Sequence, residues 1–117
     1  MATFSKQLLS GSTNGKAIKV VATATAGTTI HTAVSGTASF DEVWLYAHNS
    51  SAATVKLTLE WGEATAPDGN IEINIGAEGT GLVLVSPGIL LQNSLVIKAF
   101  AGTANVVTLT GYVNRIS

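Results

Sequence analysis

The segment Val55–Trp61 reads VKLTLEW, with an apolar residue at every odd position and a polar one at every even position. A period of two is that of a β-strand, whose successive side chains point to opposite faces of a sheet. Residues 71–75 repeat the pattern as IEINI. We therefore expect two strands, each with one face against a core and the other facing water or a partner.

Further strands are predicted where β-branched residues are frequent and turn formers such as Ser-Pro-Gly or Pro-Asp-Gly-Asn intervene. The predicted ranges are 17–24, 28–34, 42–47, 81–85, 95–100 and 106–116. Short strands at this spacing are typical of sandwiches and barrels. We predict an all-β fold of eight or nine strands in an antiparallel two-sheet sandwich. A jelly roll is favoured, an immunoglobulin-like sandwich is second and a closed barrel is third.

Charge is scarce, because only 11% of the 117 residues are Asp, Glu, Lys or Arg while 46% are hydrophobic. This composition excludes a disordered chain. The net charge of −1 leaves no basic footprint for nucleic acid or for an anionic membrane. There is no cysteine for a disulfide or a thiolate site. A surface with so few charges is expected where a protein buries part of that surface against a partner.

The organisation along the chain indicates one β-sandwich domain over residues 16–117. Residues 1–15 are expected to form an N-terminal arm or an edge strand, with Phe4, Leu8 and Leu9 as its apolar residues. No signal-like or membrane-spanning segment is recognised, since the longest apolar stretch is about half the length of a membrane helix. We expect the chain to be made and used without crossing a membrane.

The residues that could carry catalysis show no catalytic spacing. His31 and His48 are the two histidines, and neither has a partner for a nucleophile triad that the sequence can assign. His31 is expected on a half-exposed strand face in a structural role, and His48 could cap the turn after it. No metal-ligand spacing and no phosphate-binding loop are recognised. We predict a non-enzymatic protein without catalytic residues, metal or cofactor.

Aromatic residues suggest an interaction surface instead. Residues 43–47 carry apolar or aromatic side chains on both faces of their strand, with Trp44 and Tyr46 on the same one. This strand is therefore expected to be covered on both sides, either by the second sheet and a loop or by another subunit. Residues 95–100 are also apolar on both faces, which indicates oligomerisation or docking onto a larger surface. The candidate interface residues are Phe4, Leu8, Leu9, Trp44, Tyr46, Val96, Phe100 and Tyr112. A carbohydrate-binding platform built on Trp44, Tyr46 or Trp61 is the alternative from a different class.

Four segments carry a resemblance to a known family: DEVWLYAHN at 41–49, KLTLEWG at 56–62, GLVLVSPG at 81–88 and GYVNRI at 111–116. In these motifs residues 16–117 resemble small structural proteins of tailed bacteriophages, most closely the capsid cement or decoration proteins. The resemblance implies a jelly roll that self-associates, commonly as a homotrimer, and binds the major capsid protein on the outer surface of the virion. It also implies synthesis in the host cytoplasm.

Two further possibilities stay open, one for the location of the protein in the particle and one for how its N-terminal segment binds. A tail, fibre or baseplate component of the same kind of particle could have an indistinguishable fold. The apolar spacing of the N-terminal segment also suggests that residues 2–9 could add a strand to an edge of a capsid-protein sheet. The motifs are structural, so they do not separate these possibilities from a cement protein.

Overall fold

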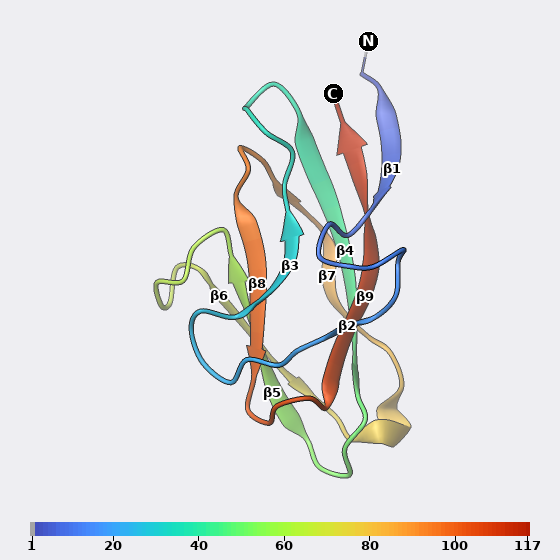
Figure 1. The fold of residues 1–117 in the computed structure, drawn as a ribbon, viewed down its shortest axis with the longest axis vertical. Helices are drawn as coiled ribbons and strands as arrows, with labels where there is room; N and C mark the ends of the chain where they lie inside the picture. The colour runs from blue at the N-terminus through green and yellow to red at the C-terminus, as the bar shows by residue number, and fades with distance from the viewer. Residues whose placement is uncertain (1) are drawn as a thin grey trace.

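Nine β-strands and one short 3-10 turn form the regular structure of residues 2–117, which this computed structural model describes (Figure 1). The elements are β1 (Phe4–Leu8), β2 (Ile18–Lys19), β3 (Thr28–Thr32), β4 (Phe40–Asn49), β5 (Val55–Trp61), β6 (Asn70–Ile75), η1 (Glu78–Thr80), β7 (Val83–Leu91), β8 (Val96–Ala101) and β9 (Val107–Ile116). Within residues 2–117 no helix is long and apolar enough to cross a membrane.

The strands form two antiparallel sheets. Sheet A has the order β1-β9-β4-β7, with β2 also paired to β9, and sheet B has the order β3-β8-β5-β6. The chain passes repeatedly between the sheets, since β4, β7 and β9 lie in sheet A while β5 and β8 lie in sheet B. The predicted two-sheet β-sandwich is thus confirmed, and the jelly-roll connectivity stays a prediction.

The core lies between the sheets and takes one face of each strand. Along β4 the odd positions are buried and the even positions are half-buried, as strand geometry requires. In β5 the odd residues from Val55 to Leu59 are buried in the core as predicted. The largest fully buried apolar side chains are Ile30, Leu45, Leu57, Leu59, Ile75, Ile97 and Leu109. Alternation therefore identified the core face of the central strands correctly.

The main difference from the predicted strands concerns β7. The sequence predicts a strand over 81–85 that ends at Ser86-Pro87-Gly88, whereas β7 continues through these residues to Leu91. Proline lacks a donor N–H and is tolerated on edge strands and at bulges. β7 is an edge strand of sheet A, and its register against β4 shifts on both sides of the Trp44–Pro87 pair. The proline therefore bends the strand without ending it.

Three other strands differ in length from the prediction. The predicted strand 17–24 is reduced to the two residues of β2, and the predicted strand 28–34 ends at Thr32. The strand predicted over 42–47 is longer, because β4 begins at Phe40 and ends at Asn49. The differences in β3 and β4 lie at the ends of the strands, where local sequence signals are weakest, whereas most of the predicted strand 17–24 lies outside β2.

The N-terminal segment forms an edge strand on the same chain. β1 pairs with β9 from Phe4–Ile116 to Leu8–Tyr112. Backbone hydrogen bonds of 2.7 and 2.9 Å between Thr3 and Ser117 extend the pairing. Leu9, which follows β1, is buried in the core with 2% of its surface exposed. In this structure residues 3–9 are thus part of the sandwich.

The outer face of sheet B is partly covered, which the alternation in β5 does not predict. Thr58 and Glu60 occupy even positions, where the pattern predicts contact with water or a partner, yet both are buried. The segment 23–27 lies against them. Thr23 and Thr58 line the same hollow, and the Gly27 N–H donates to Glu60 Oε1 over 2.6 Å. A connection between strands thus supplies a cover that no local pattern could reveal.

Candidate interface on the outer face of sheet A

The outer face of sheet A is formed by the even positions of β4 and by their neighbours on β1, β9 and β7. Its apolar and aromatic members are Phe4, Leu8, Phe40, Trp44, Tyr46, Leu84, Leu90, Tyr112 and Ile116. Phe4 is 69% exposed, Leu8 57%, Leu90 52% and Leu84 46%. Large apolar side chains gathered on one sheet face at this exposure are typical of a surface that meets a partner.

Four residues stack in a row across this face. The Tyr112 and Trp44 rings lie 6.3 Å apart between centroids and 15° from parallel. Lys6 Nζ lies over Tyr112, 4.7 Å from the centre of its ring, as in a cation–π contact. On the other side, a Cβ built on Gly88 would lie 3.0 Å from Trp44 Cζ2, so the indole packs directly against this glycine. The row fixes both aromatic rings.

Glu42 holds the Trp44 ring of this row by a hydrogen bond. Its Oε1 accepts a hydrogen bond of 2.7 Å from Trp44 Nε1 and one of 3.0 Å from Asn114 Nδ2. Both bonds favour the charged carboxylate, so they lower the pKa of Glu42 below its usual value. The bond from Trp44 has the larger effect and the bond from Asn114 the smaller. The acceptor for the indole N–H is therefore supplied by the same strand that carries the ring.

The predicted interface residues fall into three groups. Phe4, Leu8, Trp44, Tyr46 and Tyr112 lie together on the outer face of sheet A. Leu9 does not, because it is buried in the core. Val96 and Phe100 occupy even positions of β8 and lie half-buried on the outer face of sheet B. Trp61, considered for a carbohydrate platform, packs against the core from β5, whereas Trp44 lies on the outer face of sheet A.

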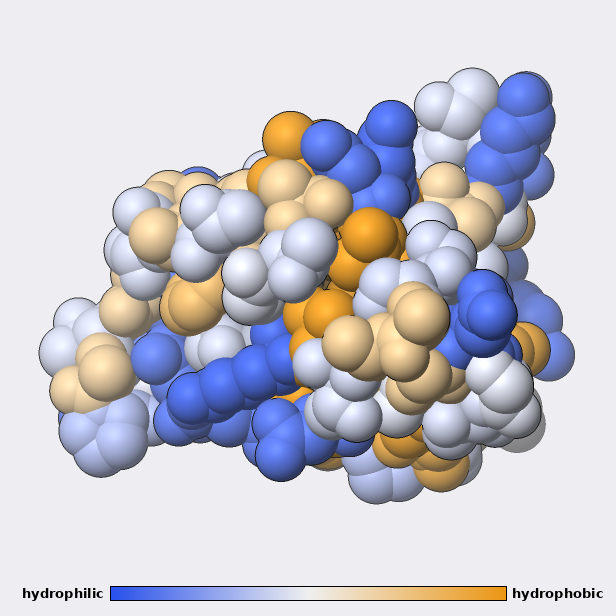
Figure 2. Space-filling model, turned by 90° about the horizontal axis from the view of Figure 1, so that it is seen from below, coloured by the Kyte–Doolittle hydropathy of each residue, from blue (hydrophilic) through white to orange (hydrophobic). Residues whose placement is uncertain are grey.

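One end of the molecule mixes polar and apolar residues on its surface. Viewed from one end of the molecule, hydrophobic residues lie among hydrophilic ones, and a group of them reaches the surface near the middle of the view (Figure 2). Leu82 and Leu95 are also exposed, but each lies outside the strands. The outer face of sheet A is thus distinguished by the gathering of aromatic and apolar residues on adjacent strands.

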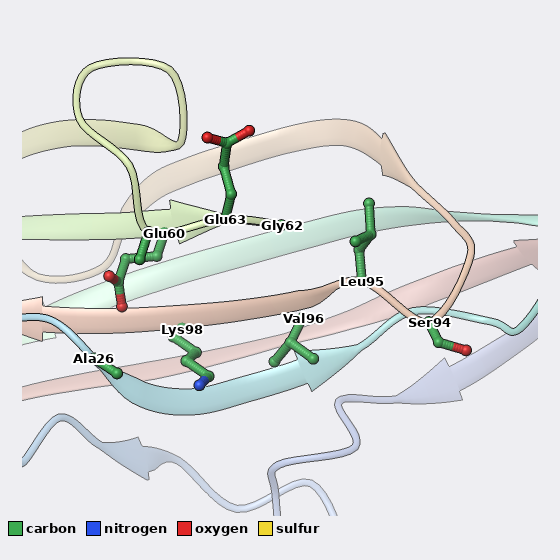
Figure 3. Close-up of a pocket in the computed structure, with 9 residues that line it drawn as sticks. Ala26, Glu60, Gly62, Glu63, Ser94, Leu95, Val96 and Lys98 are labelled. Carbon is green, nitrogen blue, oxygen red and sulfur yellow. The ribbon is translucent and has the colours of Figure 1, made fainter.

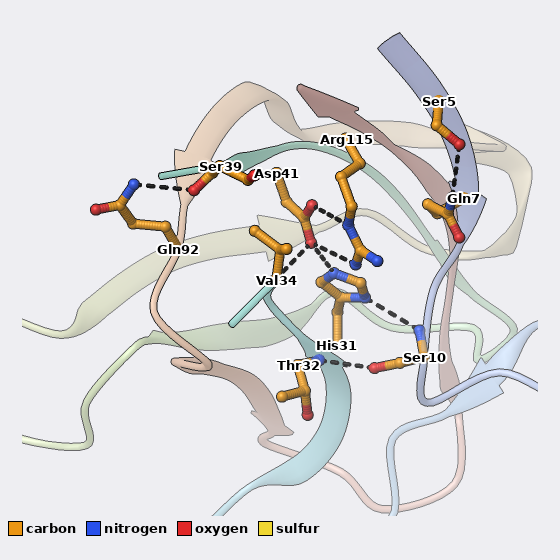
Figure 4. Close-up of polar contacts among 10 residues, drawn as sticks. All are labelled: Ser5, Gln7, Ser10, His31, Thr32, Val34, Ser39, Asp41, Gln92 and Arg115. Carbon is orange, nitrogen blue, oxygen red and sulfur yellow. Dashed lines mark hydrogen bonds and ion pairs between the residues drawn. The ribbon is translucent and has the colours of Figure 1, made fainter. Parts of the chain in front are cut away.

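A buried polar cluster links three strands and the N-terminal segment (Figure 4). Asp41 on β4 is fully buried, and its Oδ2 lies 2.8 Å from His31 Nε2 on β3. Arg115 on β9 donates from Nε to Oδ1 over 2.8 Å and from Nη2 to Oδ2 over 3.1 Å. The Val34 N–H donates to Oδ2 as well, over 3.1 Å. All of these contacts stabilise a charged carboxylate.

The charges in this cluster balance. Burial by itself raises the pKa of Asp41, but the hydrogen bonds from Arg115 and His31 outweigh it, so the pKa lies below its usual value. The bond to Asp41 raises the pKa of Arg115. A charged Asp41–Arg115 pair is therefore the state that this cluster stabilises.

The hydrogen bonds of His31 define its tautomer and its role. Its Nδ1 accepts from the Ser10 N–H over 3.0 Å, so the ring proton lies on Nε2 and is donated to Asp41. Both ring nitrogens are thus occupied, and neither contacts a hydroxyl. Ser10 Oγ instead accepts from the Thr32 N–H over 2.7 Å. Despite the residue types Ser, His and Asp, the geometry is that of a structural cluster.

The sequence prediction placed His31 on a half-exposed face and found no partner for it. The structure buries this histidine, with 1% exposed, against a carboxylate on another strand. His48 lies half-buried on the outer face of β4. The turn after it is capped by Asn49, whose Oδ1 accepts from the Ser51 N–H over 2.9 Å. No group of three or more potential metal-ligating side chains occurs in the described part of the chain.

Comparison of this chain with protein-family models, with curated proteins and with solved structures finds no match. The assignment to the two-sheet β-sandwiches therefore rests on the strands and their pairing alone.

Proposed function

We propose that this chain is a structural virion protein that binds the outer surface of a phage capsid and stabilises contacts between capsomers. In this proposal it acts as a self-associated cement or decoration protein, with a homotrimer as its unit and the major capsid protein as its partner. The observation that carries the proposal is the apolar and aromatic outer face of sheet A. The motifs at 41–49, 56–62, 81–88 and 111–116 resemble those of tailed-bacteriophage structural proteins. This resemblance is the reason for proposing a phage capsid as the binding partner.

The physical properties of this face suit a protein interface. Among the residues described on it, Lys6 and Glu42 carry the charges, and both are engaged with the aromatic row. Charged groups are costly to desolvate in the centre of an interface, whereas aromatic residues are enriched there. A trimer that touches several capsomers would also gain avidity from modest individual contacts. Rigid sheets with paired side chains lose little entropy when they bind.

Self-association is tested first, by light scattering coupled to size exclusion. We expect a closed oligomer, and a trimer in particular, from the 11.9 kDa chain. Leu84→Lys places a charge on the outer face of sheet A and should shift the chain toward the monomer. Leu95→Lys is the matched control, since this leucine is similarly exposed but lies outside sheet A. A monomeric wild type at high concentration would contradict the proposed self-association.

Binding to the particle is tested separately. Antibodies raised against the chain should label the heads of virions from the phage that encodes it. Labelling of tails or baseplates would replace the proposed location with that of a tail component, without changing the fold. Purified wild-type chain should also bind heads that lack it, and Leu84→Lys should reduce this binding while Leu95→Lys leaves it unchanged.

The carbohydrate-binding alternative finds little support in the aromatic residues. Stacking of a sugar needs an open ring face. In the row across sheet A, Tyr112 is flanked by Lys6 and Trp44, and Trp44 by Tyr112 and Gly88. We therefore expect no change in tryptophan fluorescence during titration with oligosaccharides. A saturable change that Trp44→Phe removes would favour the carbohydrate-binding function.

A further inference from the structure

A pocket of about 250 Å³ opens on the opposite side of the sandwich, on the outer face of sheet B (Figure 3). Glu60 of β5 and Lys98 of β8 face it, Ala26 lies beside them, and Leu95 and Val96 form an apolar wall. Glu63 lines the rim with its carboxylate pointing away from Glu60 (Figure 3). The volume is below the usual range for drug-sized ligands but several times that of one water.

The Glu60 carboxylate is buried and only half satisfied. The residue is 2% exposed, although it occupies an even, outward-facing position of β5. Its Oε1 accepts the Gly27 N–H over 2.6 Å, which holds the segment 23–27 on the sheet. Its Oε2 is buried and has no hydrogen-bond partner among residues 2–117. A buried acceptor without a donor is costly, and Glu60 is one of the residues that line the pocket.

Lys98 forms no ion pair with this carboxylate in the described part of the chain. The two residues are cross-strand neighbours in the β5–β8 pairing. The ion pairs found within residues 2–117 are His31–Asp41, Lys56–Glu72 and Arg115–Asp41, and none includes Glu60 or Lys98. The lining residues thus include two carboxylates and one amine, with the Glu63 carboxylate at the rim. The apolar wall of the pocket adds a preference for a hydrocarbon stem.

We propose that this pocket binds a cationic nitrogen group on a short alkyl stem, an alkylammonium or an alkylguanidinium. The cation donates an N–H to Glu60 Oε2, and its stem packs against Leu95 and Val96. Such a group can come from a lysine or arginine side chain of a protein or from a free small amine. This site is independent of the outer face of sheet A and of the proposed virion function.

The test follows the methyl resonances of Leu95 and Val96 by NMR during titration of the wild-type chain. The probes are agmatine, which is a free alkylguanidinium, and a blocked Gly-Arg-Gly peptide, which presents the same group on a backbone. Saturable shifts with agmatine alone indicate a free amine as ligand, and shifts with the peptide at an affinity equal to or higher than that of agmatine indicate a protein side chain. The absence of saturable shifts with either probe would overturn the proposal.

Glu60→Gln isolates the contact to Oε2. The glutamine can still accept the Gly27 N–H, but it presents an NH2 group where the wild type presents a free acceptor. We expect the affinity for the probe to fall by about tenfold or more, as for the loss of a charged hydrogen bond. Glu78→Gln, at an exposed position of η1, is the control and should bind as the wild type does. Equal losses in both variants would refute a specific contact.

Lys98→Met tests whether the ligand is a simple cation or also carries a negative charge that Lys98 would contact. Removing the positive charge should tighten the binding of agmatine, because the competing ammonium is lost while the stem volume is kept. Weaker binding would show that Lys98 contacts the ligand, and would overturn the assignment to a simple cation. Thermal unfolding of each variant, together with the Gly27 amide resonance, verifies that the segment 23–27 has stayed in place.

Discussion

Asp41 joins segments of the chain that have no local relationship in the sequence. His31 lies ten residues before it and Arg115 lies 74 residues after it, and both bond to its carboxylate. Sequence patterns report neighbours at short spacing, so they could not reveal this cluster. The one available signal was an acidic residue at an odd position just before Val43, Leu45 and Ala47, the apolar odd positions of the same strand, which predicts a buried carboxylate in need of partners.

The lowered pKa of Asp41 predicts how stability depends on pH. In the unfolded chain this carboxyl titrates near 3.8, and in the folded chain it titrates lower. Its contribution is therefore present above the unfolded value and is lost as the pH falls through the folded one. Urea unfolding from neutral pH down to about pH 3 should show this loss. Asp41→Asn should flatten the dependence, and an unchanged slope would contradict the assignment.

Removing the charge of Asp41 should also destabilise the protein at neutral pH. Asp41→Asn leaves Arg115 without its carboxylate in a half-buried site. Breaking one side of a buried ion pair typically costs about 3–5 kcal/mol. The free energy of unfolding by urea measures this loss. Asp68→Asn, on an exposed turn, is the control and should change stability little; a similar loss in both variants would argue against a role for the cluster.

At the scale of elements, alternation was a reliable guide to β5 and also to the edge strand β6, which was predicted over 71–75 and spans Asn70–Ile75. The limits of β5 were predicted from its alternation, because one face of this strand is in the core along its whole length. The strand predicted over 81–85 was too short because a proline in a sequence normally marks a strand end, and Pro87 follows this range. The burial of Glu60 was missed as well, because it depends on a distant loop.

Gly88 is the residue that allows β7 to pass the Trp44 ring. Its φ is +75°, a conformation that side chains rarely adopt, and an added Cβ would press on the indole. Gly88→Ala should therefore lower the free energy of unfolding by about 1–3 kcal/mol. Gly79→Ala is the matched control, because a Cβ there meets no atom within 4 Å. Thermal unfolding of the two variants makes the comparison, and equal midpoints would contradict the packing argument.

At the scale of the whole molecule, the sequence was sufficient for the fold class and insufficient for the pairing. Strand spacing predicted two packed sheets, which the structure confirms. The order of strands within each sheet depends on contacts between residues far apart, for which alternation carries no information. The gathering of Phe4, Leu8, Trp44, Tyr46 and Tyr112 on one face could likewise be suspected from composition but not located.

An oligomer held together by the outer face of sheet A should be more stable at higher protein concentration. Subunit association stabilises only the folded state, so the unfolding midpoint should rise with concentration. Leu84→Lys should remove this dependence while Leu95→Lys keeps it. Differential scanning calorimetry over a hundredfold range of concentration measures the effect. A midpoint independent of concentration in the wild type would argue against association through this face.

The position of β9 in sheet A has a consequence for biosynthesis. β1, β2 and β4 all pair with β9, and Phe4 lies opposite Ile116. A ribosome makes those three strands before the strand that joins them, so sheet A cannot assemble while β9 is still in the exit tunnel. Until then the unpaired strand edges and apolar faces are open to neighbouring chains. A nascent copy therefore presents these edges to its neighbours until its own β9 has left the tunnel.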